Sequence, residues 1–288
     1  MIDTPLVTVV MPVYNEEKVI ARAVNSLLLQ TYNNWRCIII NDGSTDNTKR
    51  YLDKLTDKRF EIVHFPQNMG RPYARQLALD KADGKYLAML DADDFYHPSK
   101  LEIQVGHMEK NPGISLLGCA LCSFGTDVDF IRIRGKGDGT IKKFHKDSKS
   151  PVTHAPSLLR LEIAKKHKYN LSLKLAQDVD FLSRYLNDTS YMVIDDVLYY
   201  YSEFDSVSVK KVLRGYYYCI IKSLKTFKSD WKFASKYLTI NLAKLVVGGI
   251  TYPFRGIDSI LKSRGQEPSP DERAEFDALM LKVTPNKL

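Results

Sequence analysis

The most informative stretch of this 288-residue sequence is Gly84-Lys-Tyr-Leu-Ala-Met-Leu-Asp-Ala-Asp-Asp94, in which a short apolar run ends in three carboxylates. Asp91, Asp93 and Asp94 repel one another unless a cation neutralises them. Hard oxygen ligands at this density suit Mg²⁺ or Mn²⁺, which usually bind one or two carboxylates together with substrate phosphates. A solvated helix start capped by Asp94 is the simpler alternative. A calcium EF-hand is excluded, because its sixth position requires Gly and Tyr96 stands there.

Outward from this stretch, apolar runs alternate with segments of helical spacing. The expected strands are Val7–Val13, Arg36–Ile40, Phe60–Phe65 and Lys85–Leu90, and the expected helices are Glu16–Gln30, Thr45–Leu55 and Arg71–Lys81. This alternation predicts an α/β fold with a mostly parallel sheet that is covered by helices on both faces.

Polar clusters directly follow the expected strands. They are Tyr14-Asn-Glu-Glu17, Asn41-Asp-Gly-Ser44, Gln67-Asn-Met-Gly70 and the acidic stretch quoted above. Ligands of such sheets bind outside the carboxyl ends of the strands, so we expect these clusters to converge on one edge. Asp42 by itself fits ordinary turn chemistry. Beside the acidic cluster, it predicts a carboxylate that binds a base or a ribose.

Four segments in this order and spacing resemble the family 2 glycosyltransferases. They are Val9-Val-Met-Pro-Val-Tyr-Asn-Glu16, Ile39-Ile-Asn-Asp-Gly-Ser-Thr-Asp46, Asn68-Met-Gly-Arg-Pro-Tyr-Ala-Arg75 and the stretch that ends at Asp94. The resemblance implies a GT-A fold with a catalytic domain at residues 1–206. Its nucleotide-sugar-binding half would be residues 1–112, and its acceptor-binding half would be residues 113–206.

The resemblance also implies roles for single residues. The nucleotide pocket would be lined by Pro12, Tyr14 and Glu16, and Asp42 would contact uracil or an equivalent base. Arg75 would lie near the nucleotide, and Asp91 near the ribose and the donor sugar. Asp93 would bind the Mn²⁺ or Mg²⁺ that bridges the diphosphate.

The catalytic base implied by the resemblance is Asp178, in Leu175-Ala-Gln-Asp-Val-Asp180. Gln177 stands where the family usually has Glu, so the surroundings of the base differ here. The alternative for Asp178 is a first-turn carboxylate that is favoured by the helix dipole. His154, in a segment that often lines the acceptor site, would either bind an acceptor hydroxyl or be structural.

One departure from the family concerns the end of the last expected strand. Many members carry Tyr-Arg-x-His there, in a loop that closes over the diphosphate. This chain has Tyr201-Ser-Glu-Phe204, so the usual basic group near Ser202 is missing. Either Lys210 or Lys211 replaces it, or the loop over the donor works differently in this chain.

The basic character of the chain is concentrated near its end. Residues 207–265 hold twelve Lys or Arg and two acids, a net charge of +10 in a chain whose formal net charge is +8. Apolar residues recur at helical spacing from Leu213 to Phe227, and Leu238–Phe254 is too short for a membrane span. We expect residues 207–288 to form a basic amphipathic helical tail, of which 207–265 bind a membrane surface. The alternative is packing on the catalytic domain or on a second subunit. Glu267–Leu288 are expected to be polar and partly disordered.

The expected function is inverting transfer of a sugar from a nucleotide-sugar donor, a UDP-sugar by first choice, to a saccharide or lipid-linked saccharide hydroxyl. A nucleotidyltransferase is the alternative enzyme, but it would carry a Gly-rich basic loop where Tyr14-Asn-Glu-Glu17 stands. A non-enzymatic basic protein that binds nucleic acid or membranes leaves the carboxylates unexplained, and we expect no nucleic-acid partner. The oligomeric state is left open.

Localisation is predicted from the start of the chain and from its cysteines. No signal peptide precedes the first strand, so we expect a cytoplasmic enzyme that is peripheral on the inner membrane face. Cys119 and Cys122 have the spacing of metal sites but stand in an apolar run, and we expect buried thiols.

Overall fold

The computed structural model describes residues 4–125, 130–144, 152–173, 175–203, 231–262 and 264–284, together with 213, 215–217, 220, 221 and 224. The chain divides into two compact units. The first comprises Met1–Cys122, Ile133–Tyr201 and Glu267–Leu288, and the second comprises Ser123–Arg132 and Ser202–Gln266.

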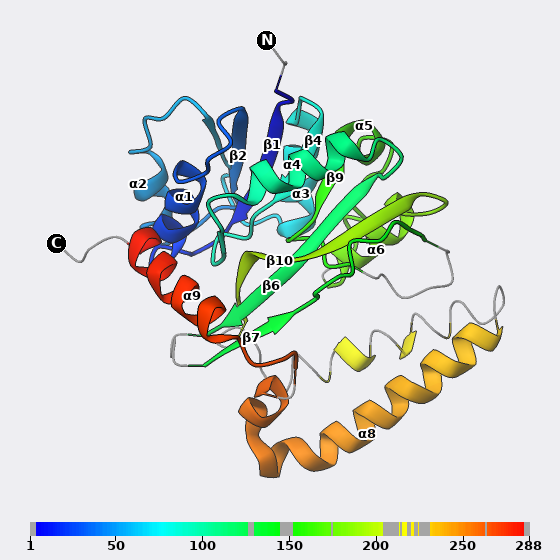
Figure 1. Ribbon diagram of the computed structural model, residues 1–288. Helices are drawn as coiled ribbons and strands as arrows, with labels where there is room; N and C mark the ends of the chain where they lie inside the picture. The colour runs from blue at the N-terminus through cyan, green and yellow to red at the C-terminus, as the bar shows by residue number, and fades with distance from the viewer. Residues whose placement is uncertain are drawn as a thin grey trace. The chain divides into compact units, whose positions relative to one another are not determined.

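Within the described residues, strands form one mixed sheet in the order β3-β2-β1-β4-β9-β6-β10-β5 (Figure 1). Its first half is parallel, and consists of β3 (Phe60–His64), β2 (Trp35–Asn41), β1 (Val7–Val13) and β4 (Tyr86–Met89). Strand β9 (Leu158–Arg160) pairs antiparallel with both β4 and β6 (Leu116–Phe124). Beyond β6 lies β10 (Ser190–Ser202), which pairs antiparallel with β5 (Phe95–Tyr96). Beside this path, β7 (Ile131–Arg134) pairs with β6, and β8 (Lys142–Lys143) pairs with β10.

Two apolar cores lie on opposite faces of the sheet. One contains side chains of α1 (Ile20–Leu28) and α4 (Lys100–Lys110), and the other contains side chains of α3 (Arg71–Lys81), α5 (Leu161–Ala164) and α6 (Gln177–Tyr185). Residues of β1 alternate between the cores, because successive side chains of a strand point to opposite faces. The prediction of an α/β fold with helices on both faces is confirmed.

Helix α1 begins later than the sequence pattern predicted. Asn15 has φ of 56°, and the backbone N–H groups of Glu16 and Glu17 donate to Thr48 Oγ1 at 2.8 Å and to Asp46 Oδ2 at 3.1 Å. Thr48 is the first residue of α2 (Thr48–Leu52), and Asp46 stands two residues before it. These bonds hold the segment after β1 as a loop, so Glu16 belongs to the edge of the sheet and not to a helix.

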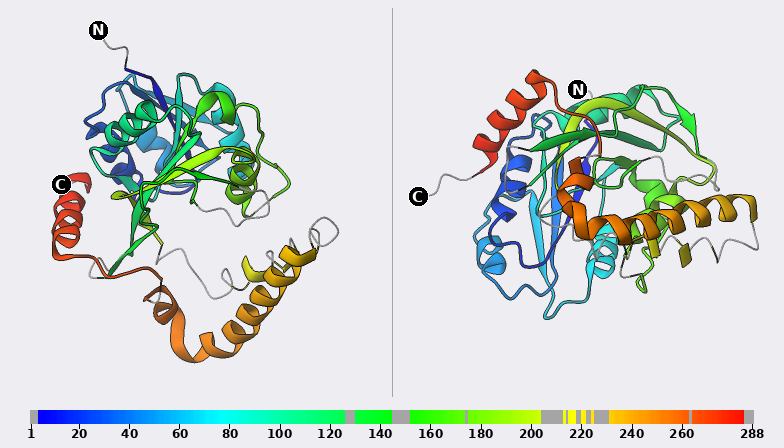
Figure 2. Two further views of the ribbon diagram at one scale, coloured as in Figure 1. Left: turned by 45° about the vertical axis from the view of Figure 1, so that its right-hand side comes forward. Right: turned by 90° about the horizontal axis from the view of Figure 1, so that it is seen from below.

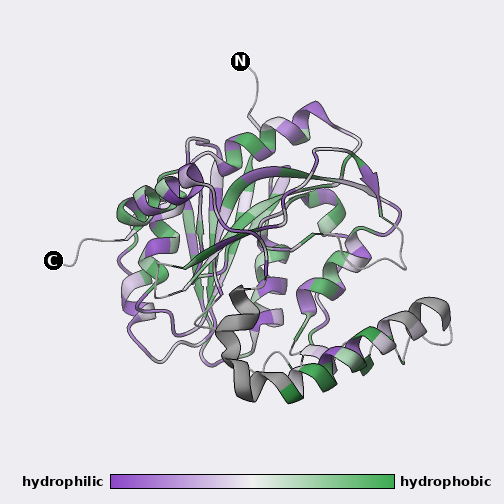
Figure 3. Ribbon diagram, turned by 60° about the horizontal axis from the view of Figure 1, so that its bottom comes forward, coloured by the Kyte–Doolittle hydropathy of each residue, from purple (hydrophilic) through white to green (hydrophobic). Residues whose placement is uncertain are grey.

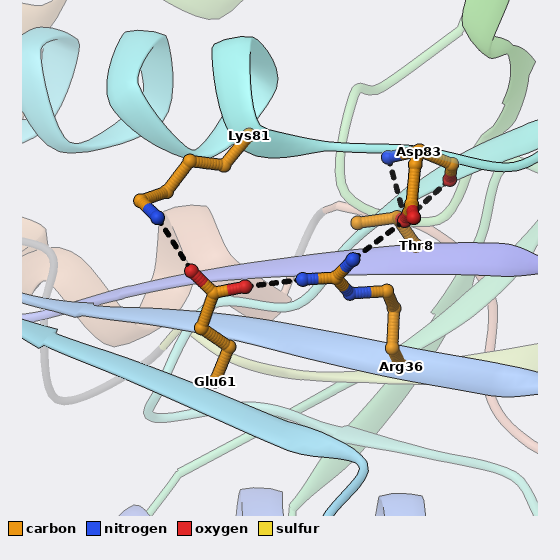
Figure 4. A network of polar contacts seen from close by, with 5 residues as sticks. All are labelled: Thr8, Arg36, Glu61, Lys81 and Asp83. Carbon is orange, nitrogen blue, oxygen red and sulfur yellow. Dashed lines mark hydrogen bonds and ion pairs between the residues drawn. The ribbon is translucent and has the colours of Figure 1, made fainter.

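Side chains tie β2 and β3 to the end of α3 (Figure 4). Arg36 contacts Glu61 and lies 2.7 Å from Asp83, while Lys81 lies 2.6 Å from Glu61. Thr8 Oγ1 donates to the Asp83 carbonyl at 2.6 Å. These charges are partly exposed, so each pair contributes only about 0–1 kcal/mol, and together they orient α3.

Helix α9 (Pro270–Val283) lies beside α1, so the expectation of a partly disordered end is wrong for these residues (Figures 1 and 2). A capping box starts the helix, since Ser269 and Glu272 each accept the other's backbone N–H. Phe276 is fully buried, with its ring centroid 6.4 Å from Phe95 and 5.9 Å from Tyr200. Packing against β5 and β10 therefore orders the C-terminal helix.

Helix α8 (Trp231–Lys262) is the long element of the second unit. In the same unit, Arg264 Nη1 lies 2.9 Å from Glu203 Oε1. Among the described helices, none combines the length and the hydropathy that crossing a membrane requires.

The packing of α9 predicts a specific loss of stability. Phe276→Ala leaves a cavity between α9 and the sheet, so the free energy of unfolding should fall by about 3–5 kcal/mol, measured by urea denaturation. Leu281→Ala is the control, because Leu281 is 81% exposed and its loss should change stability by about 0.5 kcal/mol or less. Equal stabilities of the two variants would show that α9 does not pack on the sheet in solution.

Candidate active site

The carboxyl ends of β1, β2 and β4 carry the acidic residues that the sequence singled out. Glu16 follows β1, Asp42 follows β2, and Asp91 and Asp93 follow β4. Glu16 lies within electrostatic range of Asp93, Asp91 and Asp46. The structure therefore brings Glu16, Asp91 and Asp93 to one edge of the parallel sheet.

Asp91 is paired with Arg75, which projects from α3. Arg75 Nη2 lies 3.0 Å from Asp91 Oδ1, and their side chains are 4% and 15% exposed. Burial alone raises the pKa of Asp91, but the guanidinium of Arg75 and the charge of Arg71 outweigh it and hold the pKa below its usual value. Asp91 is therefore a fixed anion inside the sheet edge.

Asp93 and Glu16 are carboxylates whose negative charge Arg75 does not neutralise. Burial and then the charge of Asp91 raise the pKa of Asp93. Burial and then Asp93 raise the pKa of Glu16 to about 7. Excess negative charge of this kind is what a divalent cation relieves, so these carboxylates fit Mg²⁺ or Mn²⁺. In the part of the chain that the structure describes, no three acidic, His or Cys side chains converge as a metal site.

Asp42 holds the neighbouring loop in place. It is 3% exposed, and its two carboxylate oxygens accept backbone N–H groups of Met69 at 2.7 Å and Gly70 at 2.9 Å. Gly43 has φ of 68°, and a Cβ there would lie 2.3 Å from the Gln67 carbonyl carbon, so only Gly permits this approach. These contacts fix the loop that leads into Arg71 and Arg75.

The remaining nucleotide-pocket candidates differ in exposure. Pro12 is buried in β1, in register with Ile40. Tyr14, two residues on, is 44% exposed at the strand end. Tyr14 can therefore meet a ligand directly, whereas the side chain of Pro12 is buried.

Asp178 lies in the first turn of α6, directly after Ala176 and Gln177. Ala176 has φ of 57°, a left-handed conformation that is rare for residues other than Gly. The charge of Asp178 acts on the pKa values of Arg75, His154 and Tyr169. The expected catalytic base therefore lies near the Arg75–Asp91 pair.

His154 is 3% exposed, and its Nε2 lies 3.1 Å from the Tyr169 hydroxyl oxygen. Burial and then the charge of Arg75 lower its pKa to about 4, so the ring is neutral at physiological pH. A neutral imidazole keeps one N–H donor for a ligand. This burial favours a fixed orientation over a freely moving surface contact.

Sequence reasoning missed Arg71 and Tyr169. Arg71 acts electrostatically on Glu16, Asp91 and Asp93, and it stands four residues before Arg75. That spacing puts both guanidiniums on one face of α3 and was readable from the sequence. Tyr169 had no such local signal. Lys210 and Lys211, the candidate replacements for the missing basic group, lie outside the described residues.

Residues 8–167 match the model of glycosyl transferase family 2. The chain belongs to this family. An uncharacterized glycosyltransferase of Methanocaldococcus jannaschii is 33% identical over 244 residues, which cover 80% of this chain and 81% of the relative. A UDP-Glc:alpha-D-GlcNAc-diphosphoundecaprenol beta-1,3-glucosyltransferase of Escherichia coli is 38% identical over 109 residues, which cover 38% of this chain and 43% of the relative.

Solved structures share the fold. TarS 1-349 of S. aureus in complex with UDP-GlcNAc has a TM-score of 0.61 and 20% identity, with 97% of this chain and 81% of that chain covered. A mannosyltransferase of Pyrobaculum calidifontis in complex with GDP-Man and Mn2+ has a TM-score of 0.59 and 14% identity, with 100% and 89% covered. This family 2 member is a glycosyltransferase with the GT-A fold, as the resemblance implied. The nucleotidyltransferase and non-enzymatic alternatives are thereby set aside.

The raised pKa of Glu16 makes stability depend on pH in the metal-free enzyme. Because the folded protein keeps a proton that the unfolded chain loses above its ordinary pKa of 4.5, the free energy of unfolding should fall as pH rises from 4.5 to about 7. Glu16→Gln should flatten this fall, and Mg²⁺ should counteract it in the unmodified protein. Urea denaturation between pH 4.5 and 8 measures both effects. Glu162→Gln, an exposed change on α5, should leave the slope intact. An identical slope in Glu16→Gln would contradict the assignment.

Proposed function

We propose that this glycosyltransferase transfers a sugar from a UDP-sugar to a hydroxyl of a lipid-linked saccharide, with inversion at the anomeric carbon. The observation that carries the proposal is the buried Arg75–Asp91 pair, which has Asp93 on one side and Asp178 within electrostatic range. The donor class is supported by the E. coli relative, which uses UDP-Glc, and by the UDP-GlcNAc bound to TarS. The acceptor class is supported by the diphosphoundecaprenol-linked substrate in the name of the same relative.

The chemistry follows from the charges at the sheet edge. Asp178 takes the proton of the acceptor hydroxyl while that oxygen attacks the anomeric carbon. The bond between the anomeric carbon and the diphosphate breaks on the opposite side, so an α-linked donor gives a β-linked product. Asp93 would hold Mn²⁺ or Mg²⁺, which supplies Lewis-acid stabilisation of the diphosphate charge. Arg71 and Arg75 add positive charge beside it, while Tyr14 and Asp42 would form the nucleotide pocket.

A second part of the proposal is peripheral attachment to the cytoplasmic membrane face through residues 207–265. Leu242, Val246 and Ile250 recur every four residues on α8 and are 44%, 58% and 62% exposed. Figure 3 shows hydrophobic residues along the long helix α8. An apolar stripe inside a segment of net charge +10 fits an anionic lipid surface better than an uncharged partner. Such attachment would keep the enzyme where lipid-linked acceptors reside.

The reaction predicts metal-dependent release of nucleotide. Incubation with UDP-, GDP- and dTDP-sugars, with Mn²⁺ or with chelator, should give release from a UDP-sugar in the presence of metal and a lipid-linked saccharide. Asp93→Asn should abolish the metal-dependent release of nucleotide. Asp178→Asn should lower the rate of sugar transfer about 10²–10⁴-fold, while nucleotide binding persists. Asp195→Asn, a change of an exposed carboxylate on β10, is the matched control. Undiminished transfer by Asp178→Asn, or a product that retains the donor's anomeric configuration, would contradict the scheme.

The attachment predicts binding to anionic vesicles. Co-sedimentation with phosphatidylglycerol vesicles should occur and should fall about tenfold or more for Val246→Ser combined with Ile250→Ser, because apolar burial is lost. Leu281→Ser, an exposed change on α9, should bind like the unmodified chain. If the double variant binds vesicles normally but changes a monomer–dimer equilibrium, then a second copy, and not a lipid surface, covers this face.

A further inference from the structure

His154 and Tyr169 form a buried pair from two separate segments. His154 lies in the loop before β9 and Tyr169 lies between α5 and α6, and each is 3% exposed. The Tyr169 hydroxyl oxygen is 3.1 Å from His154 Nε2, a hydrogen-bond distance. The pair is thus a fixed polar contact inside the second apolar core.

Aromatic packing locks both rings against α6. Tyr169 stacks on Phe181 with centroids 4.3 Å apart and planes at 11°, and His154 meets the same ring edge-on at 5.6 Å. Phe181 stands one helical turn after Asp178 on α6. On the other side, the backbone N–H of Tyr169 donates to Gln76 Oε1 at 2.7 Å, next to Arg75. Neither ring can turn without disturbing the elements that carry Arg75 and Asp178.

The hydrogen bond selects one tautomer of His154. Within the part of the chain that the structure describes, His154 is the one hydrogen-bond partner of the Tyr169 hydroxyl. A buried O–H without an acceptor costs about 1–3 kcal/mol, so the hydroxyl donates to Nε2. The neutral ring then carries its proton on Nδ1. That proton is fixed by a residue outside the acidic motifs.

The Nδ1 atom is buried and has no partner among the described residues. Arg75 Nε, from α3, is another buried donor without a partner. The charged groups that act on His154 are Arg75, Asp178 and Asp91. Buried donors left open beside these groups indicate that a ligand oxygen completes them.

We propose that Tyr169 is a positioning residue that holds His154 in its Nδ1–H tautomer, so that the ring donates a hydrogen bond to an oxygen of the bound acceptor beside Asp178. This inference rests on the proposed glycosyl transfer and adds to it the residue that orients the acceptor. In the other tautomer, Nδ1 would present a lone pair and would accept a hydrogen bond from a hydroxyl. Tyr169 thereby decides which acceptor atoms are bound well.

The experiment uses Tyr169→Phe, which removes the hydroxyl but keeps the ring that stacks on Phe181. Nitrogen-15 NMR of the histidines in the full-length, ligand-free chain reports the tautomer of each ring. The unmodified protein should show His154 as Nδ1–H, and the variant should show a shift towards Nε2–H. With the metal and donor assay above, kcat/KM for the acceptor should fall about tenfold through KM, as expected for one hydrogen bond to a neutral group.

Tyr185→Phe is the matched control. Tyr185 also packs against Phe181, at 6.3 Å, but its hydroxyl donates to the Ser115 carbonyl at 2.6 Å. The control should lose comparable stability without altering the His154 signals or KM. An Nε2–H tautomer in the unmodified protein overturns the inference by itself, even if Tyr169→Phe does not fold. An unchanged tautomer in Tyr169→Phe also overturns it. Absence of any transfer by the unmodified chain refutes the proposed function, which the ligand-free spectrum does not test.

Discussion

The ion pair of Arg75 and Asp91 is the interaction on which the site depends. Removing one partner of a buried pair leaves an uncompensated charge and typically lowers stability by about 3–5 kcal/mol. Neither residue can therefore be replaced by a neutral one without a loss of stability. The pair joins α3 to the end of β4 across the sheet edge. The pair also adds to the effect of burial, since burial and then Asp91 raise the pKa of Asp93, while burial and then Arg75 lower that of His154.

The loops around this pair are shaped by polar contacts that compete with helix formation. Glu16 and Glu17 direct their N–H groups to side chains near α2, and Asp42 takes the N–H groups of Met69 and Gly70. Each bond removes a donor that a longer helix or strand would use. The sheet therefore ends in loops at the edge where ligands of parallel sheets bind, and these hydrogen bonds hold the loops in place.

The sequence predicted what depends on local pattern. Apolar runs of four to eight residues identified the parallel strands, and the density of carboxylates at Asp91–Asp94 identified the acidic edge. The contact between Tyr169 and His154 joins segments separated by β9 and α5, and no periodicity announces it. The ordered packing of helix α9 was not predicted, although Ser269 and Glu272 have capping-box spacing, because its buried residues are limited to Phe276, Leu279 and Val283. Both features depend on tertiary packing, which the local sequence pattern does not reveal.

Charge balance links the acidic edge to the histidine pair. At Asp93, burial and the charge of Asp91 raise the pKa although Arg71 and Arg22 oppose them, and the cation proposed there would relieve this repulsion. On the side of Asp178 the same guanidinium disfavours a second positive charge, so burial and Arg75 together keep His154 neutral. In the acceptor site proposed above, a neutral ring cannot hold the acceptor by charge, so the direction of one N–H would do so. That is why a tyrosine hydroxyl, and not another acid, is the suitable partner for its far nitrogen.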